Sequence, residues 1–135
     1  MAERTAGAGD TEALGERVAA GLGPGDVVLV SGDLGAGKTT FIRGVCRGLG
    51  VEAPVTSPTF TIGHLYPGRV PVAHLDLYRL ADLGQEDPAL LEDYVTDRNV
   101  ALIEWPGAAE PRLERVSKRV LIRHLGGDER EIEID

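Results

Sequence analysis

With 135 residues and 42% hydrophobic content, the chain fits one globular domain of common size and is unlike a disordered protein. Its 14 basic and 22 acidic residues give a formal net charge of -8 without a basic run, which argues against tight nucleic-acid binding by the isolated chain. A single cysteine excludes an internal disulfide, and neither a signal peptide nor an apolar run of membrane-spanning length is visible, so we expect a cytoplasmic protein.

The first predicted elements are a flexible N-terminus over residues 1–10 and a helix over 11–22, and we expect the folded domain to span 11–135. The helix is indicated by apolar side chains that recur at helical spacing, at Leu14, Val18 and Leu22. Residues 27–30, with the sequence VVLV, form a continuous apolar run. Such a run predicts a strand that is buried on both faces.

A glycine-rich segment follows that strand directly. Gly32–Thr39, with the sequence GDLGAGKT, matches G-x-x-x-x-G-K-[ST], the phosphate loop of nucleotide-binding proteins. The glycines let successive backbone N–H groups point at phosphates, Lys38 is expected to reach the β- and γ-phosphates, and Thr39 offers its hydroxyl to Mg²⁺. The residues expected to hold the nucleotide are Asp33, Leu34, Gly35, Ala36, Gly37, Lys38 and Thr39.

The segments on both sides of this loop support the interpretation. A helix is predicted over 39–49, with Phe41, Val45 and Leu49 on one face, and its N-terminus adds the positive end of a dipole to the anion site. The alternative is a glycine-rich turn without a ligand, which the buried strand before the loop and the helix after it disfavour. A Rossmann dinucleotide site is not favoured, because the G-x-G-x-x-G spacing is absent.

The remaining elements alternate strands with one short helix. Residues 60–66 and 70–75 are predicted to form a strand pair, and 87–94 a short helix that begins at an Asp-Pro cap. The C-terminus predicts a hairpin of residues 119–125 and 130–134, which turns at Gly-Gly-Asp.

Two acids at strand ends are candidates for metal and water chemistry. Four apolar residues, 100–103, predict a buried strand that delivers Glu104, in the position where P-loop enzymes place a carboxylate that orients Mg²⁺. Asp76 follows the strand at 70–75 and is a candidate to position the attacking water or a metal-bound water. The alternatives are a surface glutamate at a strand end and an aspartate that caps a turn.

Several other residues bear on the site. Thr59, in a Ser-Pro-Thr loop, lies where related switches sense the γ-phosphate, although this sequence is also ordinary turn chemistry. ATP is a polyanion that Lys38 alone cannot neutralise, so we expect Mg²⁺ to be required. Cys46 is interpreted as core filler. For Trp105 two roles stay open, packing in the fold and recognition of a partner. The three histidines are not spaced as a metal site.

Together, four motifs resemble the bacterial TsaE family, the ATPase of tRNA threonylcarbamoyladenosine biosynthesis, over nearly the whole chain. They are GDLGAGKTT at Gly32–Thr40, SPTF at Ser57–Phe60, HLDLYR at His74–Arg79 and IEW at Ile103–Trp105. The phosphate loop is common to many proteins, whereas the SPTF and HLDLYR motifs at this spacing are more specific. Many members carry an acid shortly after the tryptophan, where this chain has Pro-Gly-Ala-Ala.

The resemblance implies a P-loop α/β domain with a mainly parallel central sheet flanked by helices. It also implies a weak Mg²⁺-dependent ATPase that supports the TsaB–TsaD pair, in which TsaD modifies the adenosine beside the anticodon, so tRNA is reached only indirectly. By resemblance, Lys38, Asp76 and Thr59 are the catalytic residues, and Thr39 and Glu104 the metal-side residues. Thr40 and Trp105 then join the nucleotide site.

A phosphate-loop protein has two other possible functions, a small-molecule kinase and a GTPase switch. A small-molecule P-loop kinase usually carries an arginine-bearing lid and an acceptor-binding insertion, for which residues 80–98 offer little room. A GTPase switch needs the guanine-reading motif N-K-x-D, which the chain lacks. The preference for ATP over GTP rests on the resemblance alone.

Overall fold

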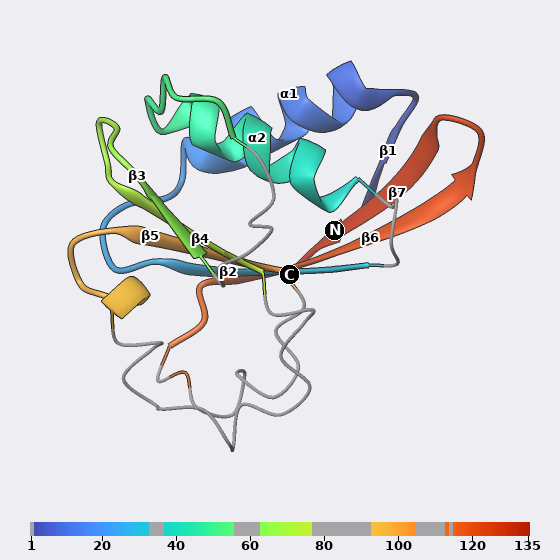
Figure 1. The fold of residues 1–135 in the computed structure, drawn as a ribbon. Coiled ribbons are helices and arrows are strands. Elements are labelled where there is room, and N and C mark those ends of the chain that lie inside the picture. Colours follow the sequence, from blue (N-terminus) through green and yellow to red (C-terminus); the bar gives the residue numbers. More distant parts are fainter. Residues whose placement is uncertain (1, 33–36, 56–62, 77–92, 105–112, 114) are drawn as a thin grey trace.

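The computed structural model describes residues 2–32, 37–55, 63–76, 93–104, 113 and 115–135. Their strands form one sheet in the order β1-β7-β6-β2-β5-β4-β3, and both described helices lie on the same face of it (Figure 1). The elements are β1 (Ala2–Thr5), α1 (Ala8–Ala19), β2 (Val27–Gly32), α2 (Lys38–Gly48), β3 (Gly63–Tyr66), β4 (Val72–Asp76), β5 (Val100–Glu104), β6 (Lys118–Gly126) and β7 (Glu129–Ile134).

The middle of the sheet is parallel and its two outer parts are antiparallel. β2 pairs in parallel with β6 on one side and β5 on the other, and β5 pairs in parallel with β4. The apolar runs of β2 and β5 are buried throughout, as parallel strands covered on both faces require. The strand pairs β1–β7, β6–β7 and β3–β4 are antiparallel. The predicted α/β class, the parallel central sheet and the C-terminal hairpin are therefore confirmed.

The larger part of the core lies between the sheet and the two helices. Three side chains were predicted to share a helix face, Phe41 and Val45 of α2 and Leu49 at its C-cap, and all three are fully buried there. Side chains of a strand alternate between its faces, so every second residue of β2 and β5 joins this layer. The intervening residues form a smaller cluster on the opposite face, made of Val27, Leu29, Leu75, Ala101 and Ile103.

The helices approach each other closely because glycines lie where they cross. A Cβ atom at Gly15 would overlap the carbonyl oxygen of Phe41, and one at Gly44 would overlap the carbonyl oxygen of Glu12. Any larger side chain at these positions would push the helices apart, since a packed interior has no free volume to receive it. This crossing holds α2, and with it the start of the helix at Lys38, in a fixed position over the sheet.

The N-terminus corrects one expectation. Residues 1–10 were predicted to be flexible and to precede the domain, but Ala2–Thr5 forms β1 at an edge of the sheet, and α1 begins at Ala8. β1 is held by its ladder with β7, a partner more than a hundred residues away in the chain. Local composition carries no signal of such a distant partner, which is why the strand was missed.

The other predicted elements are found where the structure describes them. The strand pair is observed as β3 and β4, the first helix as α1 and the second as α2, each within a few residues of its predicted bounds. Residues 60–62 of the first predicted strand and 87–92 of the predicted short helix lie outside the described residues. No helix of the described part is long and apolar enough to cross a membrane.

Candidate functional site

The candidate site lies at the edge of the sheet where the parallel strands β2, β5 and β4 end. In the strand register Val30 is paired with Glu104, and Glu104 is paired with Asp76, so both predicted acids lie abreast at this edge. β2 runs on to Gly32, where the phosphate loop begins. The crevice outside the carboxyl ends of parallel strands is the usual ligand site of open α/β sheets.

The start of α2 faces the same edge. Gly37 caps the helix with a φ of 102°, a left-handed conformation that side chains rarely adopt, and Lys38 is the first helical residue. The Lys38 side chain is buried, and its Nζ donates a hydrogen bond to the backbone carbonyl of Gly32 at 2.7 Å. Lys38 therefore connects the two ends of the phosphate loop. The positive dipole end of α2 favours an anion here.

Glu104 forms a buried pair with His74 of β4. His74 Nε2 and Glu104 Oε2 lie 2.6 Å apart, and both residues are almost completely buried, at 0% and 2% exposure. Residues two positions apart in a strand share a face, so His74 lies on the face of Val72, and Glu104 on the face of Leu102. Val72 and Leu102 pack in the helix-covered layer, and both members of the pair therefore belong to that face. The predicted alternative of a surface glutamate is wrong, because Glu104 is enclosed in the domain.

The oxygen donors at this edge fit Mg²⁺. Thr39 is in the first turn of α2, Glu104 ends β5, and Asp76 ends β4 with its side chain half-buried. Mg²⁺ takes one or two carboxylates or hydroxyls and fills its other positions with water and substrate phosphates. The carboxylate and hydroxyl oxygens at the start of α2 and at the ends of β4 and β5 are ligands of this chemical kind. Within the described ranges, no cluster of three His, Cys, Asp or Glu side chains is placed to hold a metal ion.

A second cation beside the phosphate loop comes from the C-terminal hairpin. The Nε of Arg130 in β7 lies 3.9 Å from the position that a Cβ atom of Gly37 would occupy. Its Nη1 donates to the backbone carbonyls of Gly127 and Glu129, both at 3.0 Å, which anchors the guanidinium to the hairpin turn. Arg130 could not be identified from the sequence, since only the fold of the hairpin brings it near residue 37.

Six of the predicted site residues lie outside the described residues, namely Asp33, Leu34, Gly35, Ala36, Thr59 and Trp105. The structure describes the others, and it brings Lys38, Thr39, Thr40, Asp76 and Glu104 to one edge of the sheet. His74 was noted in the sequence only as part of a motif. The alternation of β4 places residues 72, 74 and 76 on one face, so His74 could have been expected on the same face as Asp76, whereas its contact with Glu104 depends on the register between β4 and β5.

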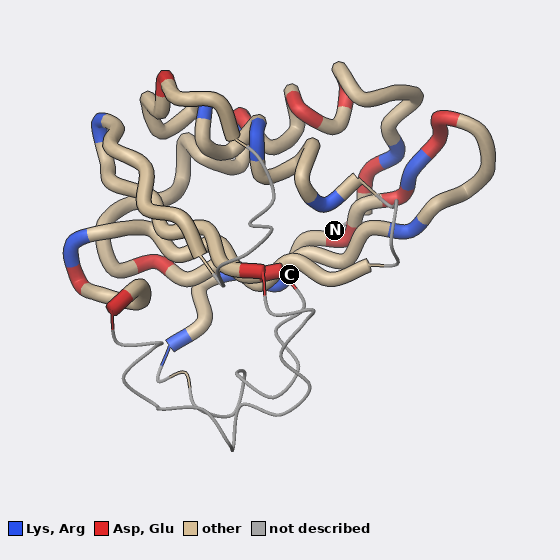
Figure 2. Tube along the Cα trace, viewed as in Figure 1, with Lys and Arg blue, Asp and Glu red and all other residues tan. Residues whose placement is uncertain are grey.

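Cys46 and two of the histidines lie outside the candidate site. Cys46 is fully buried in α2, and burial raises the pKa of its thiol to about 12, so the interpretation as core filler is confirmed. His64 Nδ1 is 2.9 Å from the hydroxyl of Tyr66, and His124 Nε2 donates to the carbonyl of Gly127 at 2.8 Å. Lys and Arg of the described chain are spread over helices, strands and turns and alternate with acids, without a basic stripe among them (Figure 2).

Comparisons with known proteins place this arrangement in context. The model of a family described as "Threonylcarbamoyl adenosine biosynthesis protein TsaE" matches residues 5–132. The chain is 42% identical over 130 residues to the tRNA threonylcarbamoyladenosine biosynthesis protein TsaE of Bacillus subtilis, covering 96% of this chain and 81% of that protein. It is 37% identical over 125 residues to the protein of the same name from Treponema pallidum, with 93% of each chain covered.

A solved structure has a similar fold. The crystal structure of YdiB from Bacillus subtilis superposes with a TM-score of 0.77 and 38% sequence identity. The match covers 98% of this chain and 82% of that one. The likeness therefore includes both the parallel centre of the sheet and the antiparallel strands at its edges.

Proposed function

The chain belongs to the TsaE family of tRNA threonylcarbamoyladenosine biosynthesis proteins, and we propose that it serves this pathway as a Mg²⁺-dependent ATPase that works with TsaB and TsaD. Hydrolysis of ATP to ADP and phosphate is slow in the isolated chain and rises when the partner pair is present. The chain supports turnover of that pair and does not itself transfer the threonylcarbamoyl group.

One observation carries the proposal of ATP hydrolysis. The buried Lys38 at the start of α2 and the two acids, Asp76 and Glu104, belong to elements that meet at a single edge of the sheet. An anion-binding helix end beside two carboxylates suits a bound nucleotide whose phosphates carry a divalent cation between themselves and the acids. The same acids without a cation would repel the phosphates.

Each side chain then has a distinct role. Lys38 exchanges the carbonyl of Gly32 for the β- and γ-phosphate oxygens, and Arg130 adds a second positive charge beside the loop. Mg²⁺, when bound with ATP, supplies charge neutralisation on the phosphates. Thr39 and Glu104 would hold it, while Asp76 orients the water that attacks the γ-phosphate. Thr59 and Trp105 are proposed to contact the nucleotide on the strength of their family motifs.

Partner proteins, not direct contact, are proposed to connect this chain with tRNA. The formal net charge is -8, and along the described chain Lys and Arg positions are interspersed with acids and do not form a basic run that could neutralise a row of phosphates (Figure 2). Docking against a protein pair depends on local complementarity and tolerates this acidity. Because tRNA is modified where it is used, we propose the cytoplasm as the location.

Two acid variants test the roles at the site. Glu104→Gln keeps an oxygen that can accept the His74 hydrogen bond but removes the charge, so the Mg²⁺ concentration for half-maximal hydrolysis should rise about tenfold. Asp76→Asn should lower the hydrolysis rate and change nucleotide affinity less, because a group that orients water acts mainly in the transition state. Magnesium titrations of phosphate release separate the two. Identical behaviour of both variants would show that the assigned roles are wrong.

A reconstitution tests the activity and the partners. Phosphate release from ATP is measured for the chain alone, with the TsaB–TsaD pair, and with candidate small-molecule acceptors. The expected result is slow hydrolysis that the pair accelerates, and tRNA modification that stalls when this chain is omitted. Phosphate transfer to an acceptor instead would favour a kinase, and submicromolar tRNA binding without a response to the pair would favour an enzyme that acts on RNA directly.

A further inference from the structure

The buried pair of His74 and Glu104 is unusual for its surroundings. His74 lies in the middle of β4, in register with Leu102 of β5. His74 and Leu102 are both fully buried. The layer that surrounds this position is built from apolar side chains of the strands and of α2. A leucine or valine would fit such an environment without the cost of burying an imidazole ring.

The hydrogen bond between His74 and Glu104 has a defined donor and acceptor. A carboxylate can only accept hydrogen bonds, so the proton between Nε2 of His74 and Oε2 of Glu104 belongs to the ring. Among the residues that the structure describes, no group hydrogen-bonds the buried Nδ1 atom of His74. A ring chosen only to stabilise the fold would be expected to satisfy both nitrogens.

Strand geometry gives the pair a link to the candidate site. Glu104 and Asp76 are abreast at the ends of β5 and β4, and His74 is two residues before Asp76 on the same face. A free glutamate side chain samples many rotamers, and ordering it is unfavourable. The ring of His74 is itself fixed by complete burial. Its hydrogen bond therefore restricts Glu104 to few rotamers and leaves one carboxylate oxygen for another ligand.

We propose that His74 is a positioning residue, which holds the carboxylate of Glu104 in the orientation that binds the magnesium ion of the nucleotide. The inference rests on the proposed function, because it requires Glu104 to act on the metal side. Residues that orient a ligating side chain typically change metal affinity about 10–100-fold when they are removed. His74 acts through Glu104 and does not itself contact the nucleotide.

The experiment measures binding of a fluorescent ATP analogue as a function of Mg²⁺ concentration, with EDTA as the metal-free point. His74→Leu removes the donor, so the Mg²⁺ concentration for half-maximal binding should rise about tenfold while affinity in EDTA stays unchanged. His74→Gln carries an amide N–H near the position of Nε2, and it should restore most of the wild-type Mg²⁺ response. His74→Asn is too short to reach Glu104 and should resemble the leucine variant.

A double-mutant cycle shows whether His74 acts through Glu104. In the Glu104→Gln background, His74→Leu should produce no further shift in the Mg²⁺ titration, because the group that it positions has lost its charge. Thr11→Val is the matched control, since it disrupts another buried polar pair, whose other member, Thr5, belongs to β1, five positions from β4 in the sheet. It should lower thermal stability and leave the Mg²⁺ titration unchanged.

The outcomes separate this inference from the proposed function. No effect of Glu104→Gln on the Mg²⁺ titration would overturn the metal role of Glu104 itself. A shift in Glu104→Gln together with a wild-type titration in His74→Leu would overturn only the positioning role. If His74→Leu does not fold, the Gln and Asn variants decide the question, and equal Mg²⁺ responses in these two would count against the proposal.

Discussion

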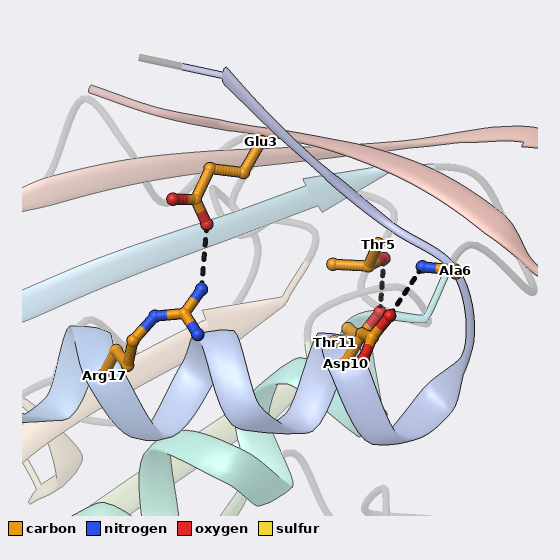
Figure 3. A network of polar contacts seen from close by, with 6 residues as sticks. All are labelled: Glu3, Thr5, Ala6, Asp10, Thr11 and Arg17. Atoms are coloured by element: carbon orange, nitrogen blue, oxygen red, sulfur yellow. Dashed lines mark hydrogen bonds and ion pairs between the residues drawn. The ribbon is translucent and has the colours of Figure 1, made fainter.

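Two buried polar pairs of this molecule differ in what surrounds them. At one edge of the sheet Thr5 and Thr11 share a hydrogen bond of 2.8 Å, in a network with Asp10, Arg17 and Glu3 that Figure 3 shows. This network joins β1 to the helix that follows it, between residues close in the chain. On the other side of the central strand, His74 and Glu104 join two strands through residues 30 positions apart.

The difference separates groups that hold the fold from groups that serve the site. The threonine pair is made of small hydroxyls that can each donate and accept, and it joins the edge strand β1 to the first turns of α1. The histidine pair has an unpartnered nitrogen among the described residues and lies beside the phosphate loop. Changes in the first region should therefore alter stability alone, and changes in the second should alter nucleotide and metal binding.

The largest expected effect comes from Lys38. Lys38→Ala removes the cation that the start of α2 directs at the phosphates, so nucleotide affinity should fall at least about 100-fold and hydrolysis should be lost. The control is Lys118→Ala, the other lysine, which starts β6 abreast of Val28 at the opposite end of β2. It should bind nucleotide normally. Fluorescent-nucleotide titration measures both, and equal affinities in the two variants would remove the phosphate-loop interpretation.

The second largest effect is expected at the crossing of α1 and α2. Gly44→Ala places a Cβ atom against the carbonyl of Glu12 and should lower the free energy of unfolding by about 2–3 kcal/mol. Gly9→Ala is the matched control in α1, where a Cβ atom meets nothing within 4 Å and should be neutral or slightly stabilising. Urea unfolding of both variants measures these changes in the free energy of unfolding. Equal midpoints would show that the helices can move apart at little cost.

The sequence predicted most of this fold because its central elements carry their own signals. β2 and β5 are continuous apolar runs, and the phosphate loop joins a buried strand to a helix with one apolar face. These features are local, and burial on both faces needs no knowledge of the partner strand. β1 has no such run, since AERT is polar and half-exposed, and only its pairing with β7 makes it a strand.

The candidate site was predicted less completely, for a related reason. Glu104 and Asp76 could be identified because each ends an apolar strand, and their meeting follows from parallel pairing. The contact of His74 with Glu104 depends on the register between β4 and β5, which the sequence does not specify. Arg130 depends on how far the C-terminal hairpin reaches past β2. Both are consequences of tertiary geometry.

A smaller effect is expected from the threonine network. Thr11→Val should lower the free energy of unfolding by about 1–2 kcal/mol, because the Thr5 hydroxyl is left buried without its partner. Replacing both threonines by valine should recover part of this loss, since no unpaired hydroxyl then remains. Thermal unfolding of the two single variants and the double variant tests the coupling. Nucleotide affinity should match wild type in all three, and a change there would contradict the separation of the two regions.

The smallest effect concerns Cys46, which lies on the same helix as Lys38 but inside the core. Burial raises the pKa of its thiol from 9.0 to about 12. Between these values the folded chain keeps a proton that the unfolded chain loses, so the thiol's contribution to stability is complete below pH 9 and declines as the pH rises toward 12.

This titration can be isolated by comparing wild type with Cys46→Ala. Between pH 8 and pH 10 wild type should lose about 1 kcal/mol more of its unfolding free energy than the alanine variant does. In the folded protein at pH 8 a thiol reagent should react with Cys46 only as fast as the chain unfolds, because the thiol is both buried and protonated. Rapid labelling that leaves the fold intact would show that solvent reaches the middle of α2. The interpretation of Cys46 as a closed part of the core would then be wrong.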